Sequence, residues 1–402
     1  MQTQEIIATA SRFVPEAEVA ANNERLQTAT EEELWQWLAT QFYRAFAEAR
    51  KGKRKTVNEQ RFEEDRDRNI AKLVRLTLDR SYTPSRGVAF IITEPVPREI
   101  FAANFSDRVI HHFLIQQTGD YWEKRLSARS FSCRVGKGTL YGVRRLETDL
   151  RQLSKNWTQD VWVMKVDFQG YFMSLPREYL FERVMWGLDR QLPKGGPVYD
   201  ICKYLWSQVI FDDPTDGVKI KGSYRDWDVL PSSKSLFYAP EGKGIVIGNL
   251  TSQWASNIAL DALDRYVIYD LGCKHYGRYV DDAYFVGKTR EELLYIREKV
   301  TKRVAEMGLT LHPKKHYLQP ASRGVNFLGA TVYPNRTVVA KRFRKNLRKL
   351  KHKINHEGIS QENLTSLVAF KGLAQHYNHR QAFCDIYGED IFDNIKMWQD
   401  LA

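Results

Sequence analysis

Two adjacent carboxylates, Asp281 and Asp282, lie between two runs of residues rich in Tyr, Phe and Val. The runs, 275–279 and 283–286, predict two strands that a tight acidic turn connects. Two like charges at one turn repel each other unless a hard cation lies between them. The pair therefore predicts a metal site, with ordinary turn chemistry as the alternative, because Asp is favoured in turns for its own hydrogen bonds.

A third carboxylate, Asp167, follows the apolar run 161–166, which predicts another strand. Together the three carboxylates would hold two Mg²⁺ ions, or Mn²⁺, with the carbonyl of Phe168 as a further oxygen ligand. Two such ions serve in-line phosphoryl transfer, because one lowers the pKa of the attacking hydroxyl and the other neutralises the leaving pyrophosphate. The alternative is that these carboxylates form buried ion pairs or cap turns.

The elements that must position these residues follow from the spacing of apolar side chains. Apolar residues at helical spacing predict two or three helices over 28–82, and the segment 107–122 predicts another. Between them, 88–92 and 99–101 are typical of strands. A Gly-rich loop follows at 133–139.

From 161 to 333 strands and helices alternate, which predicts an α+β fold with an antiparallel sheet. The segment 212–243 interrupts this pattern with Gly, Pro, Asp and Ser, and we expect a long ordered loop there because it also carries aromatic residues. The last 60 or so residues are helical in pattern and basic, beginning at Lys341.

Composition indicates a globular protein with a polyanionic partner. The 402 residues carry a formal net charge of +12, and nucleic acid is the simplest partner for such a charge. The four cysteines form no C-x-x-C pair, which favours reduced thiols in the cytoplasm over a zinc site or disulfides. The first 21 residues lack a leader pattern, and no window predicts a membrane span.

The order of five motifs resembles that of prokaryotic reverse transcriptases from about residue 80 to 335. These motifs are 166–172, 248–253, 279–282, 311–316 and 326–329. The resemblance implies a right-hand polymerase fold with an N-terminal helical extension of the fingers over 1–83, fingers over 84–160, a palm over 161–335 that includes the insertion 212–243, and a helical thumb over 336–402.

One motif is narrower than the family pattern. Group II intron enzymes usually carry Gln before the Gly and Pro after the Ser of this motif, whereas this chain has Ile247 and Gln253. With the loop 131–139, this departure is similar to the diversity-generating retroelement enzymes and to the defence-associated, unknown-group reverse transcriptases of bacteria. Both branches are related to the group II intron enzymes.

The resemblance implies several nucleotide contacts. Phe172, five residues after Asp167, matches the aromatic residue that excludes a ribose 2′-hydroxyl, unless it is an ordinary core residue. Gly248 would let the backbone approach the nucleotide, because a Cβ would obstruct it, and Gln253 belongs to the same motif. Ile247 would loosen nucleotide choice, because it replaces a hydrogen-bonding Gln, unless it is a core residue beside a strand.

Cations from the fingers would clamp the triphosphate of the nucleotide. The candidates are Arg98, Arg108, Arg134 and Lys137. The last two flank glycines whose backbone N–H groups could also bind phosphate. For Arg108 the alternative is an ion pair with Asp107 at a helix start.

Further roles concern the leaving group and the primer and template. Lys315 would protonate the departing pyrophosphate, or else it is a solvated lysine. The residues expected at the primer and template are Tyr279, Phe327, Leu328, Gly329, Lys345 and Lys349. Phe327 and Leu328 are equally explained as the core of a hairpin.

The expected function is RNA-directed DNA synthesis, making cDNA from a dedicated, structured non-coding RNA, with a lean towards antiviral defence. The expected partners are that RNA, the cDNA and deoxynucleoside triphosphates, with an accessory protein or a homo-oligomer and no membrane. The chain ends soon after the thumb, so template choice is expected to come from outside the core. The alternatives are a mutagenic enzyme of a diversity-generating retroelement, a template-independent or protein-primed polymerase, and a non-catalytic RNA-binding scaffold.

Overall fold

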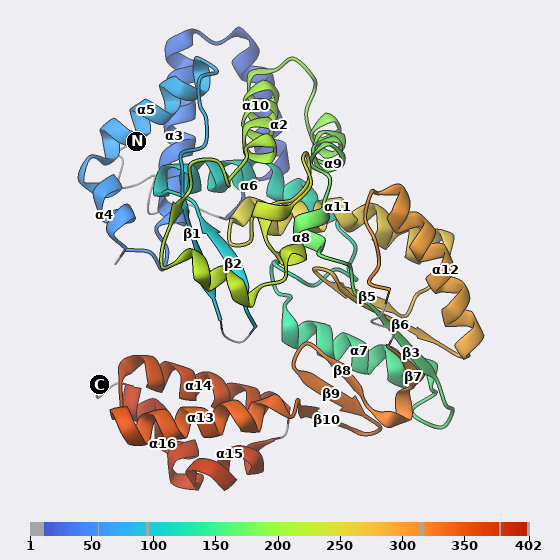
Figure 1. The fold of residues 1–402 in the computed structure, drawn as a ribbon. Coiled ribbons are helices and arrows are strands. Elements are labelled where there is room, and N and C mark those ends of the chain that lie inside the picture. The colour runs from blue at the N-terminus through green and yellow to red at the C-terminus, as the bar shows by residue number, and fades with distance from the viewer. Residues whose placement is uncertain (1–11, 55, 94–95, 314–316, 378, 400–402) are drawn as a thin grey trace. The chain divides into compact units, whose positions relative to one another are not determined.

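The computed structural model describes residues 12–54, 56–93, 96–313, 317–377 and 379–399. They form two compact units. The first comprises Met1–Ala128, Phe168–Tyr266 and Val300–His312, and the second comprises Arg129–Asp167, Val267–Lys299 and Pro313–Ala402. Helices and strands occur in both units, so the predicted α+β class is confirmed (Figure 1).

The first unit is built around one buried helix, α6 (Phe105–Arg125), whose residues are buried on nearly all sides. The buried residues of α6 include polar ones such as Asp107, His111 and Gln116, and α6 packs against helices on several sides. Thr30 and Glu33 form a capping box at the start of the longest of these, α3. The surrounding helices are α2 (Glu16–Arg25), α3 (Glu31–Ala49), α4 (Val57–Glu64), α5 (Arg66–Leu78), α8 (Tyr171–Ser174), α9 (Arg177–Gln191), α10 (Pro197–Phe211) and α11 (Leu250–Arg265).

A small sheet in the same unit has the order β2-β1-β4. β1 (Val88–Ile92) pairs antiparallel with β2 (Arg98–Ala102), and β4 (Lys219–Ile220) pairs parallel with β1. β4 belongs to the insertion 212–243, which also forms three short 3₁₀ helices, η2 (Tyr224–Val229), η3 (Ser232–Lys234) and η4 (Leu236–Tyr238). The insertion is therefore regular in part and attached to the sheet.

The second unit contains a four-stranded antiparallel sheet of order β5-β6-β3-β7. Its strands are β3 (Trp162–Val166), β5 (Tyr276–Tyr279), β6 (Asp282–Gly287) and β7 (Tyr317–Pro320). Successive residues on β3 and β6, such as Val163 with Met164 and Tyr284 with Phe285, are all buried. Because neighbouring strand residues point to opposite faces, the sheet is covered on both sides.

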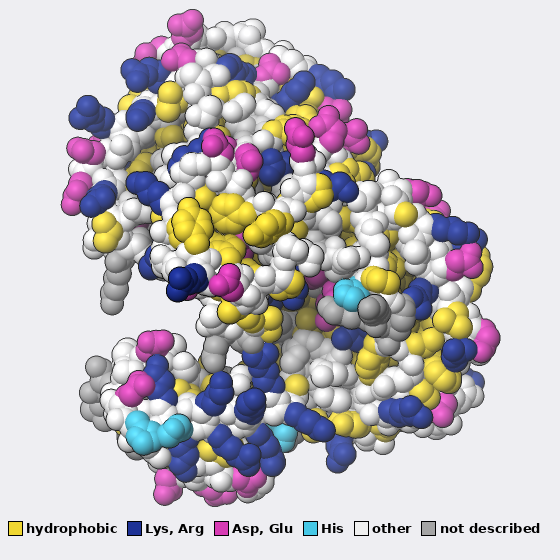
Figure 2. Space-filling view, viewed as in Figure 1, with side chains coloured by type: hydrophobic (Ala, Val, Ile, Leu, Met, Phe, Trp, Pro, Cys, Tyr) yellow, Lys and Arg dark blue, Asp and Glu magenta, His cyan; other side chains and the backbone are white. Residues whose placement is uncertain are grey.

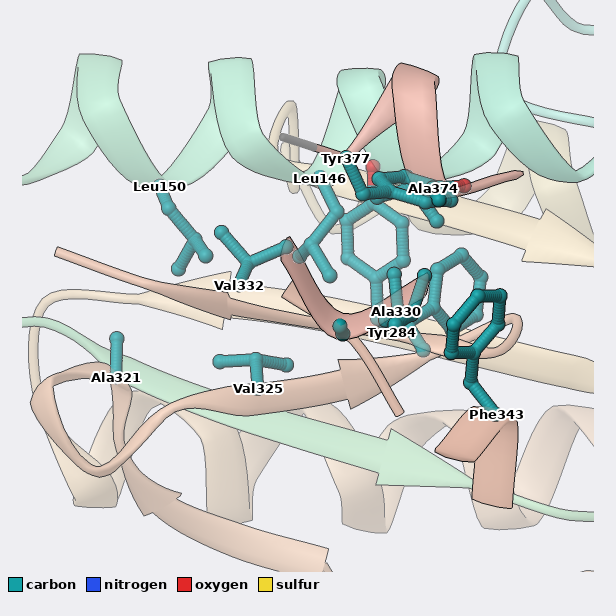
Figure 3. Packing of buried hydrophobic residues seen from close by; sticks show 14 of the residues in the cluster. Leu146, Leu150, Tyr284, Ala321, Val325, Ala330, Val332, Phe343, Ala374 and Tyr377 are labelled. Carbon is teal, nitrogen blue, oxygen red and sulfur yellow. The ribbon is translucent and has the colours of Figure 1, made fainter. Parts of the chain in front are cut away.

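One hydrophobic core connects this sheet with the rest of the second unit (Figure 3). Leu146 and Leu150 of α7 (Thr139–Leu153) point towards the strands, and Phe343 of α13 (Arg342–Glu357) reaches the same cluster from the C-terminal helices. The remaining elements of the unit are α7 (Thr139–Leu153), a π-helical turn (Tyr266–Asp270), α12 (Arg290–Glu306), which runs into the first unit, β8 (Val325–Phe327), β9 (Ala330–Tyr333), β10 (Arg336–Val339), α13 (Arg342–Glu357), α14 (Gln361–His376), α15 (Arg380–Tyr387) and α16 (Glu389–Gln399).

The predicted elements agree with the observed ones to within a few residues. β1 has the predicted bounds, and the strands predicted at 161–166, 275–279 and 283–286 are β3, β5 and β6. The predicted division into fingers, palm and thumb stays a prediction, because compactness divides the chain into two units instead.

Candidate active site

The acidic turn connects β5 and β6 in the second unit. Tyr279 pairs with Asp282, so Val280 and Asp281 form the two-residue connection. Val280 has a φ of 56°, which a β-branched residue rarely adopts. A residue held in this region needs surrounding contacts that compensate for its strain, and such residues are concentrated at functional sites.

The strand register brings Asp167 to this turn. Val166 of β3 pairs with Ala283 of β6 in antiparallel register. The next residue on each side of that pair is Asp167 on one strand and Asp282 on the other. Directly opposed residues of antiparallel strands lie about 4.5–5.5 Å apart at Cα and point to the same face. All three predicted carboxylates therefore occur at one end of one sheet.

A lysine accompanies them on the same face. Lys165 lies two residues before Asp167, and its Nζ is 3.6 Å from Oδ1 of Asp282. The same Nζ lies 5.5 Å from the ring centroid of Tyr317 and 5.9 Å from that of Phe327. Lys165 thus places one positive charge beside the carboxylates.

The carboxylates match Mg²⁺ or Mn²⁺ in chemistry, because hard cations prefer carboxylate oxygens. Within the part of the chain that the structure describes, no three His, Cys, Asp or Glu side chains are gathered closely enough to hold a metal ion. Asp282 instead lies 3.6 Å from the ammonium group of Lys165. The residue types and the register fit a metal site, and the ligand assignment of Asp167, Asp281 and Asp282 stays a proposal.

A buried arginine, Arg278, stabilises the acidic turn through hydrogen bonds. Arg278 is fully buried, and its guanidinium donates to the carbonyl of Val280 at 2.8 Å and to Oγ of Ser130 at 3.3 Å. The backbone N–H of Val280 donates to Oγ of Ser132 at 3.1 Å. Both polar groups of the strained residue are therefore satisfied, as buried backbone groups must be.

A second buried network anchors the loop that carries Ser130 and Ser132. Asp149 of α7 accepts from Arg129 at 2.7 Å and from the hydroxyl of Tyr284 at 2.8 Å, with Nδ1 of His275 at 3.4 Å. Burial, followed by the charge of Asp149, raises the pKa of Tyr284 well above its usual value, so the hydroxyl stays a donor. Arg129 in turn accepts from the N–H of Arg278 through its carbonyl, at 2.8 Å.

Four residues of these networks were not among the predicted site residues: Arg278, Ser130, Ser132 and Asp149. Ser130 and Ser132 lie 148 residues from their partners on the turn, so no local pattern connects them. The only available signal was the placement of an arginine directly before the Tyr-Val-Asp-Asp sequence, inside an otherwise apolar strand.

Two of the predicted triphosphate ligands lie in this loop. Arg134 and Lys137 each donate to the carbonyl of Ser130 at 3.4 Å. Gly136 and Gly138 between and after them have positive φ values of 68° and 137°, which suit glycine. The structure brings these two cations together beside the serines that hold the acidic turn.

The other two predicted triphosphate ligands, Arg98 and Arg108, lie in the first unit. Arg98 is exposed at the start of β2. Arg108 donates to the carbonyl of Ala103 at 3.1 Å, and burial lowers its pKa. Asp107 instead accepts from Tyr82 and Ser85, so the alternative of an Asp107–Arg108 ion pair is wrong.

Phe172, Ile247 and Gly248 also lie in the first unit. Phe172 and Ile247 are partly buried and pack against one hydrophobic cluster with Phe101 and Leu236. Gly248 has a φ of 120°, and a Cβ there would lie 3.3 Å from Ile100. Phe172 and Ile247 are each half buried, so each packs on the core and also exposes part of its side chain, and their nucleotide roles stay a prediction.

The remaining predicted residues are dispersed. Gln253 is exposed on the first turn of α11, and Tyr279 is partly buried, with its pKa raised by burial. Phe327 is buried against Tyr284 with ring centroids 5.1 Å apart, as the hairpin-core alternative predicted. Leu328 and Gly329 have φ values of 48° and 85° and form the two-residue turn between β8 and β9.

Lys345 and Lys349 are exposed on α13 and line one hollow with other cations of that helix. Figure 2 shows dark blue side chains gathered over α13.

Phe168 follows Asp167 directly along the chain and forms an isolated antiparallel β-bridge with Leu311 in the first unit. Lys315 lies outside the described residues. In the described part of the chain, no helix combines the length and the apolar character needed to cross a bilayer.

Solved structures of telomerase are similar to this chain in part. Apo telomerase from Candida tropicalis, truncated from its C-terminal domain, matches with 14% identity and a TM-score of 0.44, over 64% of this chain and 55% of that one. Telomerase from Candida tropicalis in complex with the TWJ fragment of telomeric RNA matches with 12% identity and a TM-score of 0.43, over 80% and 55%. The chain thus spans about half the length of these telomerases. A search of curated proteins found no significant match.

Residues 97–332 match the family described as reverse transcriptase (RNA-dependent DNA polymerase). This segment contains β2 with Arg98, the whole four-stranded sheet and all three carboxylates. The mixed helices and strands together with this match confirm the predicted right-hand polymerase fold class. Because the match covers more than half of the 402 residues, the chain belongs to the reverse transcriptase (RNA-dependent DNA polymerase) family.

Proposed function

We propose that this protein synthesises DNA on an RNA template by a two-metal mechanism at the acidic end of the β5-β6-β3-β7 sheet. RNA-directed DNA polymerase activity is the activity of the family to which it belongs. The observation that supports the site is the register that sets Asp167 opposite Asp282, beside Asp281. Carboxylates are retained together at one sheet end, where their mutual repulsion lowers stability unless cations bind there.

In this mechanism each group has a distinct task. Asp167, Asp281 and Asp282, with the carbonyl of Phe168, would hold two divalent ions, which when bound supply Lewis-acid activation and charge neutralisation. Lys165, whose Nζ lies 3.6 Å from Oδ1 of Asp282, would lose this contact when Asp282 holds an ion. Arg134 and Lys137 provide positive charge for the triphosphate.

The loop 129–134 has a positioning role in the same proposal. Its serines and Arg278 hold the backbone of Val280, so the two aspartates of the turn keep one geometry. Preorganised ligands do not have to be reordered during the reaction, which favours catalysis.

The finer assignment is that the template is a dedicated structured RNA and that the enzyme serves antiviral defence. The net charge of +12 and the exposed cations of α13 support a nucleic-acid partner. The departures at Ile247 and Gln253 from the group II intron pattern support this branch over intron enzymes. The four cysteines are free of disulfides, which is compatible with the predicted cytoplasmic location.

The test replaces both carboxylates of the turn by their neutral isosteres, Asp281→Asn with Asp282→Asn. Incorporation of deoxynucleotides on a primed RNA template is measured with Mg²⁺ and with Mn²⁺. We expect a loss of at least about a thousandfold in rate, because charge stabilisation by bound ions contributes several kcal/mol to the transition state. Thermal unfolding and RNA affinity should stay close to those of the unmodified protein.

The matched control is Glu31→Gln with Glu32→Gln, an adjacent acidic pair in the first turn of α3. This control removes the same two negative charges at positions distant in sequence from Asp281 and Asp282, and it should leave DNA synthesis unchanged. Undiminished incorporation by the Asn double variant would show that the metal site lies elsewhere, and a control with equal loss would show that the effect is one of net charge.

A further inference from the structure

The insertion 212–243 is fixed to β2 by one buried carboxylate. Glu99 is 1% exposed. Its Oε1 accepts from Nε1 of Trp227 and from Oγ of Ser235, both at 2.6 Å, and its Oε2 accepts from the backbone N–H of Leu236 at 2.7 Å. All three donors belong to the insertion, so a single side chain of β2 holds η2 and η4.

Hydrogen bonds to an ionised acceptor are roughly twice as strong as neutral ones, and burial strengthens them further. The residues that follow Glu99 on β2, Ile100 and Phe101, are apolar, so the strand itself offers no polar partner for a buried acid. The hydrogen-bond partners of Glu99 come from the insertion instead.

The insertion shares one hydrophobic cluster with the predicted nucleotide residues. Leu236 is buried in one cluster with Phe101 and Met173, and Phe172 and Ile247 pack against this cluster. Further members from the insertion are Val218, Ile220, Trp227 and Ala239. Figure 1 shows the insertion, in yellow-green, lying against β1 and β2.

Backbone contacts set the same region. The N–H of Ile245, just after the insertion, donates to the carbonyl of Phe172 at 2.8 Å, and the N–H of Phe101 donates to the carbonyl of Ile247 at 3.3 Å. A Cβ on Gly170 would lie 2.8 Å from the carbonyl oxygen of Ser233 in η3. The insertion thus touches the segment of Phe172 closely, and a shift of the insertion would free that segment.

We propose that the insertion is the wall that holds Phe172 and Ile247 in place, and that Glu99 is the positioning residue through which this wall sets nucleotide selectivity. This role rests on the proposed function, because it assumes that Phe172 excludes the ribose 2′-hydroxyl. A ring acts as a steric gate only while it cannot move aside. The insertion would restrain that movement because Leu236 belongs to the cluster against which Phe172 packs, and Glu99 keeps the insertion in place.

The chemistry of Glu99 provides a sharp variant. Its three partners are all donors, so Glu99→Gln must direct an NH₂ group at one of them and leave a buried N–H or O–H unsatisfied. Trp227→Phe removes one donor and keeps an aromatic ring in the cluster. Glu241→Gln, on an exposed residue of the same insertion, is the matched control.

The experiment measures kcat/KM for a ribonucleotide and for its deoxynucleotide on a primed RNA template, using the full chain. Phe172→Ala serves as the reference for an open gate. We expect Glu99→Gln and Trp227→Phe to raise the ribonucleotide-to-deoxynucleotide ratio by roughly tenfold and severalfold, respectively, as expected for the loss of one buried hydrogen bond. Glu241→Gln should leave the ratio unchanged. The variant that combines Glu99→Gln with Trp227→Phe should raise the ratio by less than the product of the two single effects, because both changes remove the same hydrogen bond.

Hydrogen exchange of the insertion is the second measurement, and we expect its amides to exchange faster in Glu99→Gln. A change that lowered both kcat/KM values equally would indicate a structural role alone and overturn the proposal. An unchanged ratio in Glu99→Gln beside a changed ratio in Phe172→Ala would also overturn it, while leaving the proposed function intact. If the unmodified protein incorporated no deoxynucleotide, the proposed function and this role would both fail.

Discussion

At the scale of single residues, the candidate site combines negative charge with one nearby cation. The register of β3 and β6, extended by one residue beyond Val166, sets Asp167 opposite Asp282, and Lys165 lies 3.6 Å from Asp282. Its Nζ lies within cation–π distance of two rings while it approaches Asp282 at 3.6 Å. An ammonium group in this position competes with a divalent ion for the same carboxylate.

Replacing this lysine tests the competition. Lys165→Met keeps the length of the side chain and removes the charge, so we expect the Mg²⁺ concentration for half-maximal DNA synthesis to fall about two- to fivefold. The size follows from the ~0.2–1 kcal/mol of a partly exposed ion pair. A titration of activity with Mg²⁺ checks this, with Lys288→Met, an exposed lysine after β6, as the control. A higher Mg²⁺ requirement would mean that Lys165 helps to assemble the site.

At the scale of elements, α13 separates an apolar face from a basic one. Phe343 and Leu347 are buried, and the opposite side carries a hollow lined by cations and one histidine. The lining residues are Lys341, Arg344, Lys345, Arg348, Lys349 and His352. Residues three and four apart share one side of a helix, so this arrangement forms a continuous basic strip along the helix.

Duplex binding should depend on this strip through phosphate contacts. Removing Lys345 and Lys349 by substitution with Ala should reduce the slope of log affinity against log salt by about 0.9 for each lysine. The loss of affinity should be similar for unrelated sequences. Binding of an RNA–DNA duplex over a range of KCl concentrations measures it, and Lys288→Ala is the control. A slope that does not respond would assign both lysines to a solvated surface.

At the scale of the whole molecule, acid should unfold the protein through buried histidines. Burial lowers the pKa of His111 to about 3 and that of His112 to about 4. The pKa of a histidine in the unfolded chain is about 6.5. Below that pH the unfolded chain binds protons that the folded chain does not, so the free energy of unfolding decreases as the pH is lowered. Burial raises the pKa of Asp107 and of Asp261, so these carboxyls bind protons more readily in the folded chain and oppose this trend.

The free energy of unfolding should therefore decrease by about 2–4 kcal/mol between pH 6.5 and pH 5, since each histidine contributes up to about 1.4 kcal/mol per pH unit. Urea titrations at both pH values measure this decrease. His111→Gln should flatten the pH dependence by up to half, whereas His352→Gln on the exposed side of α13 should leave it unchanged. A flat profile for the unmodified protein would contradict the burial of neutral histidines.

The sequence by itself determined the elements that carry the chemistry. Continuous runs of apolar and aromatic residues predicted β3, β5 and β6, because such runs are typical of strands that are buried on both faces, and the acidic residues stand directly at the ends of these runs. The resemblance of the motifs predicted the reverse transcriptase family, which the match over 97–332 confirms. These features are local along the chain, so a reading of neighbouring residues suffices for them.

Only the tertiary structure decided how these elements are held. Arg278 meets Ser130 across 148 residues, and Glu99 meets Trp227 across 128. Neither pair has a periodic signal, because a buried polar group is defined by a partner that the fold supplies and not by its neighbours in sequence. The insertion 212–243 has no sustained period for the same reason: its order depends on Glu99 and on the cluster around Leu236 rather than on its own local pattern.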